Sequence, residues 1–205
     1  MSLARIVRFD TTRYRFAEIA SADAFEGHTL SKLHLLCEQL TGERRNGGQP
    51  SLADSLSLRK RLAALADGSR FYQTYHRFIN DVVAVLYGGK ISYSAHPTFR
   101  VHLAHSPAVS KWHRDVDVTG REDQINAWVP FVDVEGTNSL WVEQDYGRAD
   151  YAPVRLRYGE ILLFDGGLLS HGSVANTSDV TRVGMDFRFA PKRGICPGYD
   201  VLATR

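Results

Sequence analysis

The chain has 205 residues, of which 43% are hydrophobic and 23% are charged, and its formal net charge is +2. These values are typical of a globular protein, and at roughly 100–200 residues per domain they predict one domain. No run of about 18 apolar residues occurs, so a membrane span is not expected. The small net charge and the lack of basic clusters argue against nucleic-acid binding. Two cysteines and an N-terminal segment without a long apolar core favour a reducing, cytoplasmic location.

Helical periodicity dominates the chain before about residue 88. Apolar residues recur at helix spacing from Leu33 to Leu40 and again from Leu56 to Leu65, where Gly68 would end the helix. The clearest pattern is an apolar stripe from Phe71 to Leu86, followed by two glycines that stop it. The ten residues 42–51, rich in glycine and polar residues, read as an exposed loop. Such helices need a partner surface, because their stability comes mostly from packing of the apolar face.

After residue 90 the hydrophobic period changes to two, which is typical of strands. The candidate strands are 90–95, 98–104, 125–132, 139–143, 154–158, 160–165 and 183–190. Short strands separated by turn signals predict an antiparallel sandwich or barrel. We therefore expect one domain over 1–205, mainly β with N-terminal helices. Residues 1–89 would form mainly helical support for a jelly-roll core over 90–190.

Three of these strands carry an unusually polar face. Residues two apart in a strand share a face, and the polar faces hold Arg100 and His102; Gln124, Asn126 and Trp128; and Arg182, Asp186 and Arg188. Half-solvated sheet surfaces would explain each strand separately. A polar cavity inside the barrel would explain all three together. The sequence leaves both interpretations open.

Two histidines and one aspartate stand in a pattern that suits a metal ion. His113 and Asp115 would point the same way if their segment is extended. His171 lies between glycines after the apolar strand 161–164 and could be a third ligand. Taken alone, the His113 and Asp115 pair is also common in surface loops, and a histidine such as His171 is also common in packed cores. Together they form the two-histidine, one-carboxylate set of non-haem iron oxygenases, which leaves three positions of an octahedral ion open.

An arginine accompanies this set. The turn signal at 176–179 predicts a hairpin that would pair His171 directly with Arg182. A buried arginine is costly unless it meets an anion. The partner could be Asp186 or Asp179, or the far carboxylate of a dicarboxylic co-substrate whose other end chelates the metal. Zinc hydrolysis is possible on ligand type alone, but Arg182 favours a 2-oxo acid.

The segments around these residues match a known family in order, from about residue 98 to 190. They are Trp112–Asp115, Gln124–Phe131, Asn138–Val142, Gly159–Asp165, Leu169–Ser173, Asn176–Ser178, Arg182 and Asp186–Phe189. The chain resembles the Fe(II)/2-oxoglutarate-dependent oxygenases. Within them it resembles the phytanoyl-CoA hydroxylase-like branch and the small StrG-type proteins of streptomycin biosynthesis.

The resemblance implies a cupin-like double-stranded β-helix that uses Fe(II), 2-oxoglutarate and O2. It implies iron held by His113, Asp115 and His171, and 2-oxoglutarate anchored by Arg182. Further candidate contacts of the co-substrate are Ser173, Arg100, His102 and Asn126. Because Asp115 is present, the resemblance implies hydroxylation or a related oxidation, with release of succinate and CO2, rather than halogenation.

The substrate is less well defined. Residues 115–150 hold nine acidic and two basic residues, and an acidic cavity mouth, including Asp117 and Asp145, would attract a cationic molecule. Solvated loops would explain the same acidity. With the resemblance, this favours an aminoglycoside or aminocyclitol, or next an amino acid. Further candidate substrate contacts are Trp128, Trp141 and Arg188.

Two alternatives remain. One is a cupin-like metalloenzyme that does not use 2-oxoglutarate, with Arg182 in a structural role. The other is a jelly-roll sugar-binding module without catalysis, which explains the tryptophans and acidic loops but leaves the histidine, aspartate and arginine set as coincidence.

Overall fold

The computed structural model describes residues 4–42 and 48–191, and within these ranges the strands form two antiparallel sheets. The larger sheet has six strands in the order β1-β7-β4-β9-β2, with β3 also paired to β9, and the smaller has the order β6-β5-β8. The strand bounds are β1 Ala4–Arg8, β2 Ile91–Tyr93, β3 Thr98–His102, β4 Ile125–Pro130, β5 Trp141–Glu143, β6 Tyr151–Pro153, β7 Glu160–Phe164, β8 His171–Gly172 and β9 Arg182–Pro191.

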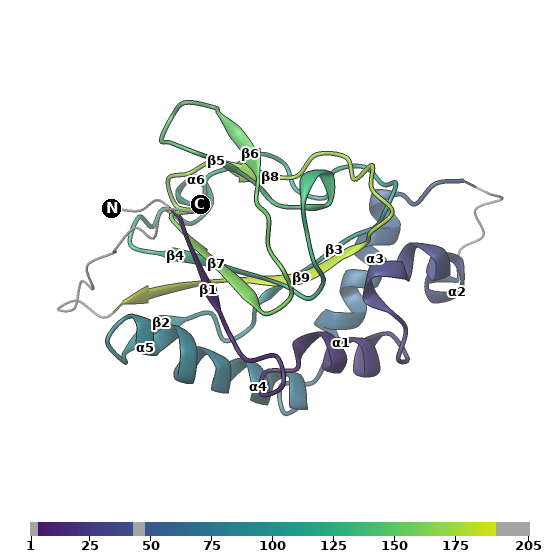
Figure 1. The fold of residues 1–205 in the computed structure, drawn as a ribbon, viewed down its shortest axis with the longest axis horizontal. Helices are drawn as coiled ribbons and strands as arrows, with labels where there is room; N and C mark the ends of the chain where they lie inside the picture. Colours follow the sequence, from purple (N-terminus) through teal and green to yellow (C-terminus); the bar gives the residue numbers. More distant parts are fainter. Residues whose placement is uncertain (1–3, 43–47, 192–205) are drawn as a thin grey trace.

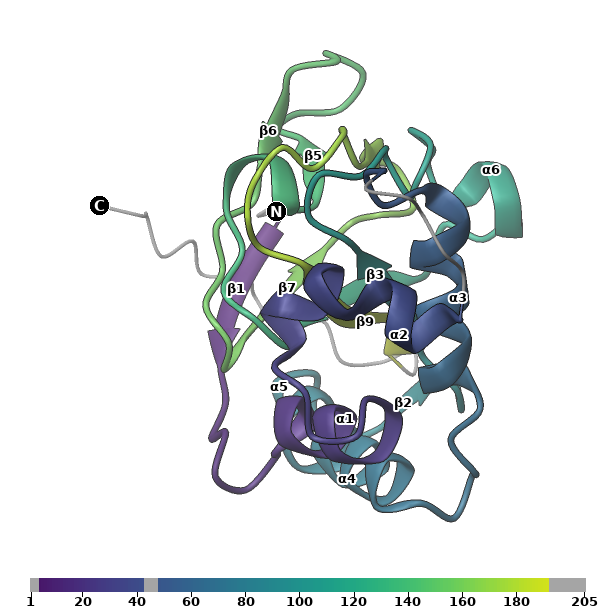
Figure 2. The same ribbon diagram turned by 90° about the vertical axis from the view of Figure 1, so that its right-hand side faces the viewer.

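The helices that precede residue 90 cover one face of the larger sheet, and the smaller sheet lies over the opposite face (Figure 1). The α-helices are α1 Phe16–Ala24, α2 Cys37–Thr41, α3 Leu52–Ala63, α4 Arg70–Phe78, α5 Ala84–Leu86 and, after the sheet has begun, α6 Val116–Thr119. A 3-10 helix spans Leu30–Leu36, and a short 3-10 helix at Gly136–Asn138 precedes β5. A π-helical turn at Ile79–Val83 joins α4 to α5. Figure 2 shows α1 and α4 side by side beneath the sheet.

Strand β9 separates an apolar layer from a polar one. Its residues Val183, Met185 and Phe187 are buried in the core that the helices cover, together with Phe99 and Val101 of β3. The intervening residues face the smaller sheet, where Arg100, Asn126, Trp128, Arg182 and Asp186 line one cavity. The polar strand faces therefore enclose a cavity, and the interpretation as solvated sheet surfaces is wrong.

A second, smaller apolar cluster holds the two sheets together. Trp128 of β4, with Leu162 and Phe164 of β7, packs against Val142 of β5 and Leu169 of the loop before β8. The site described below lies at the edge of this cluster, so apolar packing surrounds its polar groups.

Most predicted elements are confirmed. Helical structure runs from residue 70 to 86, although the π-helical turn inside it was not expected. Six of the seven predicted strands overlap an observed strand. The strand predicted at 154–158 is wrong, because the pairing with β5 involves Tyr151–Pro153. Beyond Pro153 the chain turns toward Val134, with which Leu156 forms an isolated bridge.

Two N-terminal elements were not predicted. Strand β1 is the edge strand that pairs with β7 from Ala4 to Arg8, and it is mostly exposed, so it carries no apolar alternation that a sequence pattern could reveal. Helix α1 is short. Of the loop expected at 42–51, residues 43–47 lie outside the described residues, as does Cys196; Cys37 is buried in the core. Across the described ranges, the helices are all too short or too polar to cross a membrane.

Candidate metal centre

His113 and His171 are joined by an isolated antiparallel bridge. The backbone N–H of His113 donates to the carbonyl oxygen of His171 at 3.1 Å, and the N–H of His171 donates to the carbonyl oxygen of His113 at 3.0 Å. Residues paired in this way present their side chains on the same face of the ladder. The two imidazole centroids are consequently 4.4 Å apart.

The hydrogen bonds of the imidazoles define which ring nitrogen is available. Nδ1 of His113 lies 2.8 Å from the carbonyl oxygen of Lys111, and Nδ1 of His171 lies 3.0 Å from that of Leu169. A carbonyl oxygen only accepts, so each Nδ1 carries the proton and donates it. The Nε2 lone pairs of both rings remain for a metal ion, an arrangement typical of metal-binding histidines.

Asp115 completes the group, but its backbone is not extended as expected. Its φ of −67° and ψ of −26° are helical, and it stands immediately before α6. Its backbone N–H donates to the carbonyl oxygen of Gly166 at 2.8 Å, which fixes this turn against the end of β7. The carboxylate is 1% exposed, and Oδ1 lies 3.5 Å from Nε2 of His113 and 4.0 Å from Nε2 of His171.

The three residues fit a divalent metal ion. One ligand atom from each of His113, Asp115 and His171 lies within 4.8 Å of the other two. Neighbouring ligands about 2.1 Å from a shared octahedral ion are roughly 3 Å apart, so a small contraction brings these atoms to bonding distance. Two neutral imidazoles and one carboxylate are ligands that iron, zinc and nickel accept.

Two further side chains hold the carboxylate of Asp115. Arg188 donates from Nε to Oδ2 at 2.6 Å and from Nη2 to Oδ1 at 2.7 Å, while Asn126 donates from Nδ2 to Oδ2 at 2.6 Å. Burial alone would raise the pKa of Asp115. The nearby imidazole of His113 and the hydrogen bonds from Arg188 and Asn126 together outweigh burial and place the pKa of Asp115 well below its ordinary value.

Arg182 lines the same cavity, where none of the described carboxylates bonds to it directly. Its side chain is 2% exposed, and its Nε and Nη1 atoms have no hydrogen-bond partner among the described residues. Burial, and then the charge of Arg100, lower the pKa of Arg182 to about 9. Its guanidinium carbon lies 5.8 Å from the ring centroid of Trp128, a distance at which a cation–π contact contributes modestly.

The neighbouring charges on this face of the sheet are already paired. Arg100 donates to Asp186 at 2.6 Å, and Arg188 holds Asp115. The charge of Asp186 also acts on Arg182, but its carboxylate is bonded to Arg100, so among the described residues Arg182 has no direct ion pair. The cavity has about 410 Å³ of free volume, counting its open mouth.

The predicted pairing of His171 with Arg182 is wrong. His171 pairs with Val142 of β5, and Arg182 pairs with His102 of β3. Instead of turning tightly, the chain between them passes from one sheet to the other. There the side chain of Asn176 donates to the carbonyl oxygens of Leu103 and Val180. Both His171 and Arg182 nevertheless line the cavity, so the expected neighbourhood arises from two facing sheets rather than from one hairpin.

The remaining co-substrate candidates have other partners in the structure. Oγ of Ser173 accepts the backbone N–H groups of Val109 and Ser110 at 3.0 and 2.9 Å, so it anchors the segment before His113. His102 is fully buried beside Arg182, and burial, with the charge of Arg182, lowers its pKa to about 3. Arg100 and Asn126 line the cavity, engaged with Asp186 and Asp115 respectively.

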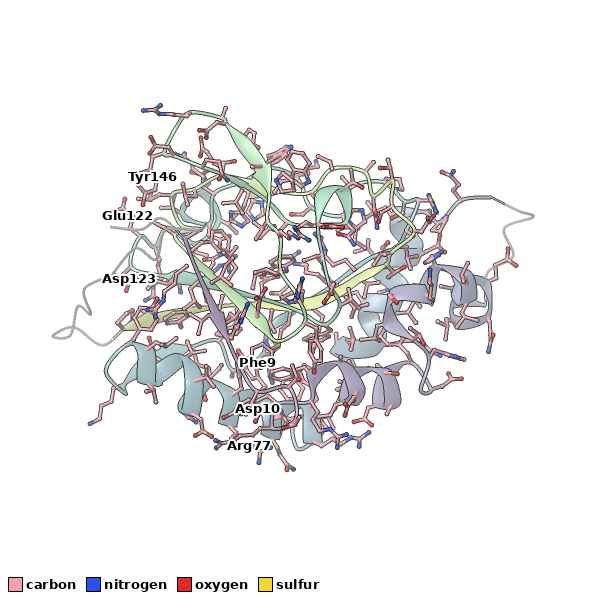
Figure 3. The ribbon with its side chains drawn as sticks, viewed as in Figure 1. Phe9, Asp10, Arg77, Glu122, Asp123 and Tyr146 are labelled. Carbon is pink, nitrogen blue, oxygen red and sulfur yellow. The ribbon has the colours of Figure 1, made fainter. Side chains whose placement is uncertain are left out.

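The candidate substrate contacts separate into cavity and surface residues. Trp128 lines the cavity, whereas Trp141 donates from Nε1 to the carbonyl oxygen of Gly136 outside it. The acidic charges that were expected to attract a cation are largely paired: Asp117 with Arg114, and Asp145 with Arg148. Figure 3 shows Glu122, Asp123 and Tyr146 at one side of the molecule, and Asp123 is paired with Arg121.

Sequence reasoning missed the partners of Asp115. Arg188 was a candidate substrate contact and Asn126 a candidate co-substrate contact, yet both donate to the metal-ligand candidate. Their positions on polar strand faces were a signal, because Asn126 and Arg188 pair directly across β4 and β9. Gly166 leaves room for the side chain of Asn126, because a Cβ atom there would lie 2.5 Å from Cγ of Asn126.

The chain resembles known proteins both in sequence and in fold. No protein-family model matches the chain. Over 130 residues the chain is 40% identical to the streptomycin biosynthesis protein StrG of Streptomyces griseus, a match that covers 63% of this chain. The match spans 59%, about three fifths, of the length of this curated relative.

Solved structures share the fold. The crystal structure of AviO1 from Streptomyces viridochromogenes Tue57 aligns with a TM-score of 0.58 at 14% identity, covering 96% of this chain and 93% of that one. The non-heme monooxygenase ThoJ, in its nickel complex, aligns with a TM-score of 0.51 at 18% identity, covering 90% of this chain and 80% of that one. The fold of this chain is therefore one that a non-heme monooxygenase also has.

Proposed function

We propose that the chain is a non-haem Fe(II)- and 2-oxoglutarate-dependent oxygenase with a double-stranded β-helix core. His113 and His171 would hold the iron through Nε2, and Asp115 through a carboxylate oxygen. The likeness to StrG supports a role in the synthesis of an antibiotic or a related secondary metabolite. The fold shared with a non-heme monooxygenase supports the reaction class.

The observation that carries the proposal is the unpaired guanidinium of Arg182 in the cavity of the triad. Leaving two buried donors unsatisfied costs free energy, and leaving a buried charge without a counter-ion costs more. A dicarboxylic 2-oxo acid would satisfy both requirements with its far carboxylate, while its keto and near carboxylate oxygens reach the metal. A hydrolase or a sugar-binding module has no evident use for such a cation.

The remaining residues orient the reactants and exclude water. When bound, ferrous iron supplies the activation of O2 that is coupled to oxidative decarboxylation of the 2-oxo acid. The backbone bridge between His113 and His171 keeps the two imidazoles oriented. Leu140, Trp128 and Phe164 form apolar walls of the cavity, which keep water from the reacting groups and strengthen the pairing with Arg182.

We further propose that the substrate is a small polar molecule of the aminoglycoside or aminocyclitol type. The name of the StrG relative is the support for this class. Because Asp117 and Asp145 are paired with arginines, their charges add little support to it. An amino acid, free or carried on a partner, is the second class to screen.

An anaerobic titration tests the function. Apo-protein is titrated first with Fe(II) and then with 2-oxoglutarate while visible absorption is recorded, with H171A and R182A beside the wild type. We expect a charge-transfer band that needs both additions, is absent in H171A and is weak in R182A. Iron binding without any band would favour the metalloenzyme that does not use 2-oxoglutarate. Absence of iron binding would leave the non-catalytic module.

A further inference from the structure

The carboxylate of Asp115 accepts three side-chain hydrogen bonds, and they are distributed unevenly between its two oxygens. An ionised carboxylate offers about four lone-pair sites, two on each oxygen. Oδ2 accepts from Nε of Arg188 and from Nδ2 of Asn126, both at 2.6 Å, so both of its sites are used. Oδ1 accepts only from Nη2 of Arg188, at 2.7 Å.

The one remaining site of Asp115 belongs to the oxygen that faces the histidines. Oδ1 is the atom that lies 3.5 Å and 4.0 Å from the two Nε2 atoms. The planar fork of Arg188 bonds both oxygens at once, so it fixes the rotation of the carboxylate as well as its place. Asn126 cannot present its oxygen to the acceptor Asp115, so its amide orientation is also fixed.

We propose that Arg188 and Asn126 are positioning residues that restrict Asp115 to one metal bond, through Oδ1. This inference rests on the proposed function, since it assumes that the triad binds a metal ion. Its consequence is that Asp115 cannot chelate with both oxygens. Three adjacent positions of an octahedral ion therefore stay open, as a bidentate 2-oxo acid and O2 require together.

A second effect of Arg188 acts in the opposite direction. Its guanidinium brings a positive charge close to a site for a divalent cation, and repulsion between them would weaken metal binding. We expect the orientation of the Asp115 carboxylate by Arg188 to strengthen metal binding more than this repulsion weakens it. Removing Arg188 then weakens metal binding, whereas an electrostatic role alone would make removal strengthen it.

The test uses Co(II) as the metal probe, because its visible bands report coordination number and geometry. Co(II) is titrated into the apo forms of the wild type, R188Q, R188K and N126A, and affinity and spectrum are both recorded. Far-UV circular dichroism and the melting temperature of each apo form establish that it is folded. The matched control is R114Q. Arg114 makes the same kind of two-point contact, but to the exposed carboxylate of Asp117, which is not part of the triad.

We expect R188Q to bind Co(II) about 10–100-fold more weakly than the wild type, with a changed spectrum, because Asp115 becomes free to rotate. R188K keeps the positive charge but loses the two-point contact with the carboxylate. Its affinity for Co(II) should therefore lie between those of R188Q and the wild type, while its spectrum stays different from that of the wild type. N126A should resemble R188K, and it serves with R188K if R188Q does not fold. R114Q should match the wild type in both readouts.

Three outcomes would overturn the inference, and they separate it from the function on which it rests. If the wild type binds Co(II) and the Arg188 and Asn126 variants show the same affinity and spectrum, the positioning role is wrong and the proposed function stands. Tighter binding by R188Q would also overturn it, since repulsion would then dominate. If the wild type itself binds no Co(II), the proposed function fails first.

Discussion

His113 and His171 exchange two backbone hydrogen bonds, at 3.1 and 3.0 Å, across 58 residues of sequence separation. This bridge sets the spacing of two imidazoles whose Nδ1 atoms are both held by carbonyl oxygens two residues earlier, those of Lys111 and Leu169. The Nε2 atoms of both imidazoles are thus positioned mainly by backbone geometry. Asp115, in contrast, depends on side chains for its orientation.

Gly166 is expected to be essential because the amide of Asn126 occupies the space of a side chain there. In G166A the new Cβ atom would lie 2.5 Å from Cγ of Asn126, so Asn126 must move away from Asp115. We expect a loss of about 1–3 kcal/mol in the free energy of unfolding, typical of overpacking, together with weaker Co(II) binding. Urea unfolding and metal titration measure the two effects.

The adjacent glycine provides the control for this substitution. A Cβ atom at Gly167 would lie 3.3 Å from Oδ1 of Asp165 and farther from other atoms. G167A should therefore change stability and metal affinity much less than G166A. Equal effects of the two substitutions would contradict the role given to the contact between Gly166 and Asn126.

Replacing Arg182 should separate stability from function. R182M removes a buried, unpaired charge and keeps much of the apolar stem, so the free energy of unfolding should stay equal or rise by about 1 kcal/mol or more. Binding of 2-oxoglutarate to the iron-loaded protein should be lost. Denaturant unfolding and the charge-transfer titration check the two results.

The contrasting variant is R100M. Arg100 is paired with Asp186, so its removal leaves a partly buried carboxylate without its partner. R100M is expected to destabilise the fold, opposite in sign to R182M. If R182M proves as destabilising as R100M, Arg182 has a structural partner that this account does not recognise.

Burial of His102 should make stability depend on pH. The pKa of His102 is lowered from 6.5 to about 3, first by burial and then by Arg182. Between these values the unfolded chain binds a proton that the folded chain does not. The stability contribution is therefore present above pH 6.5 and is lost as the pH falls toward 3.

H102Q removes this titration while keeping a donor for the carbonyl oxygen of Pro107, which lies 3.0 Å from Nε2 of His102. Between pH 6 and 4 the free energy of unfolding of H102Q should fall less steeply than that of the wild type, by a slope equivalent to about one proton. Denaturant titrations across this range measure the difference. Parallel slopes for the two proteins would contradict the assignment.

The sequence allowed the layers of the fold to be predicted, since periodicity depends on local burial alone. The alternation of Val101 with Arg100, and of Val183 with Arg182, separates the helix-covered core from the cavity. Strand β1 escaped prediction because it is an exposed edge strand, and edge strands need little apolar pattern. Pairing over long distances, as between β1 and β7, leaves no signal in either segment.

The sequence predicted which residues lie together better than it predicted how they are arranged. His113, Asp115, His171 and Arg182 do gather around one cavity region, as expected. The expected hairpin between His171 and Arg182 was wrong, because the turn residue Asn176 bonds to the neighbouring β3 end and to Val180 instead of closing a two-strand ladder. Side-chain bonds such as those of Arg188 depend on tertiary register, which a single sequence does not specify.

We propose that Arg182 receives the far carboxylate of a 2-oxo acid bound at the triad. The most direct test measures the affinity of anaerobic, iron-loaded protein for 2-oxoglutarate and for 2-oxopentanoate, which has the same chain length without the far carboxylate. The wild type should prefer 2-oxoglutarate by about 30-fold or more, the discrimination expected when a buried charge pair loses one partner. R182M should lose that preference. Equal binding of both acids by the wild type would contradict the account.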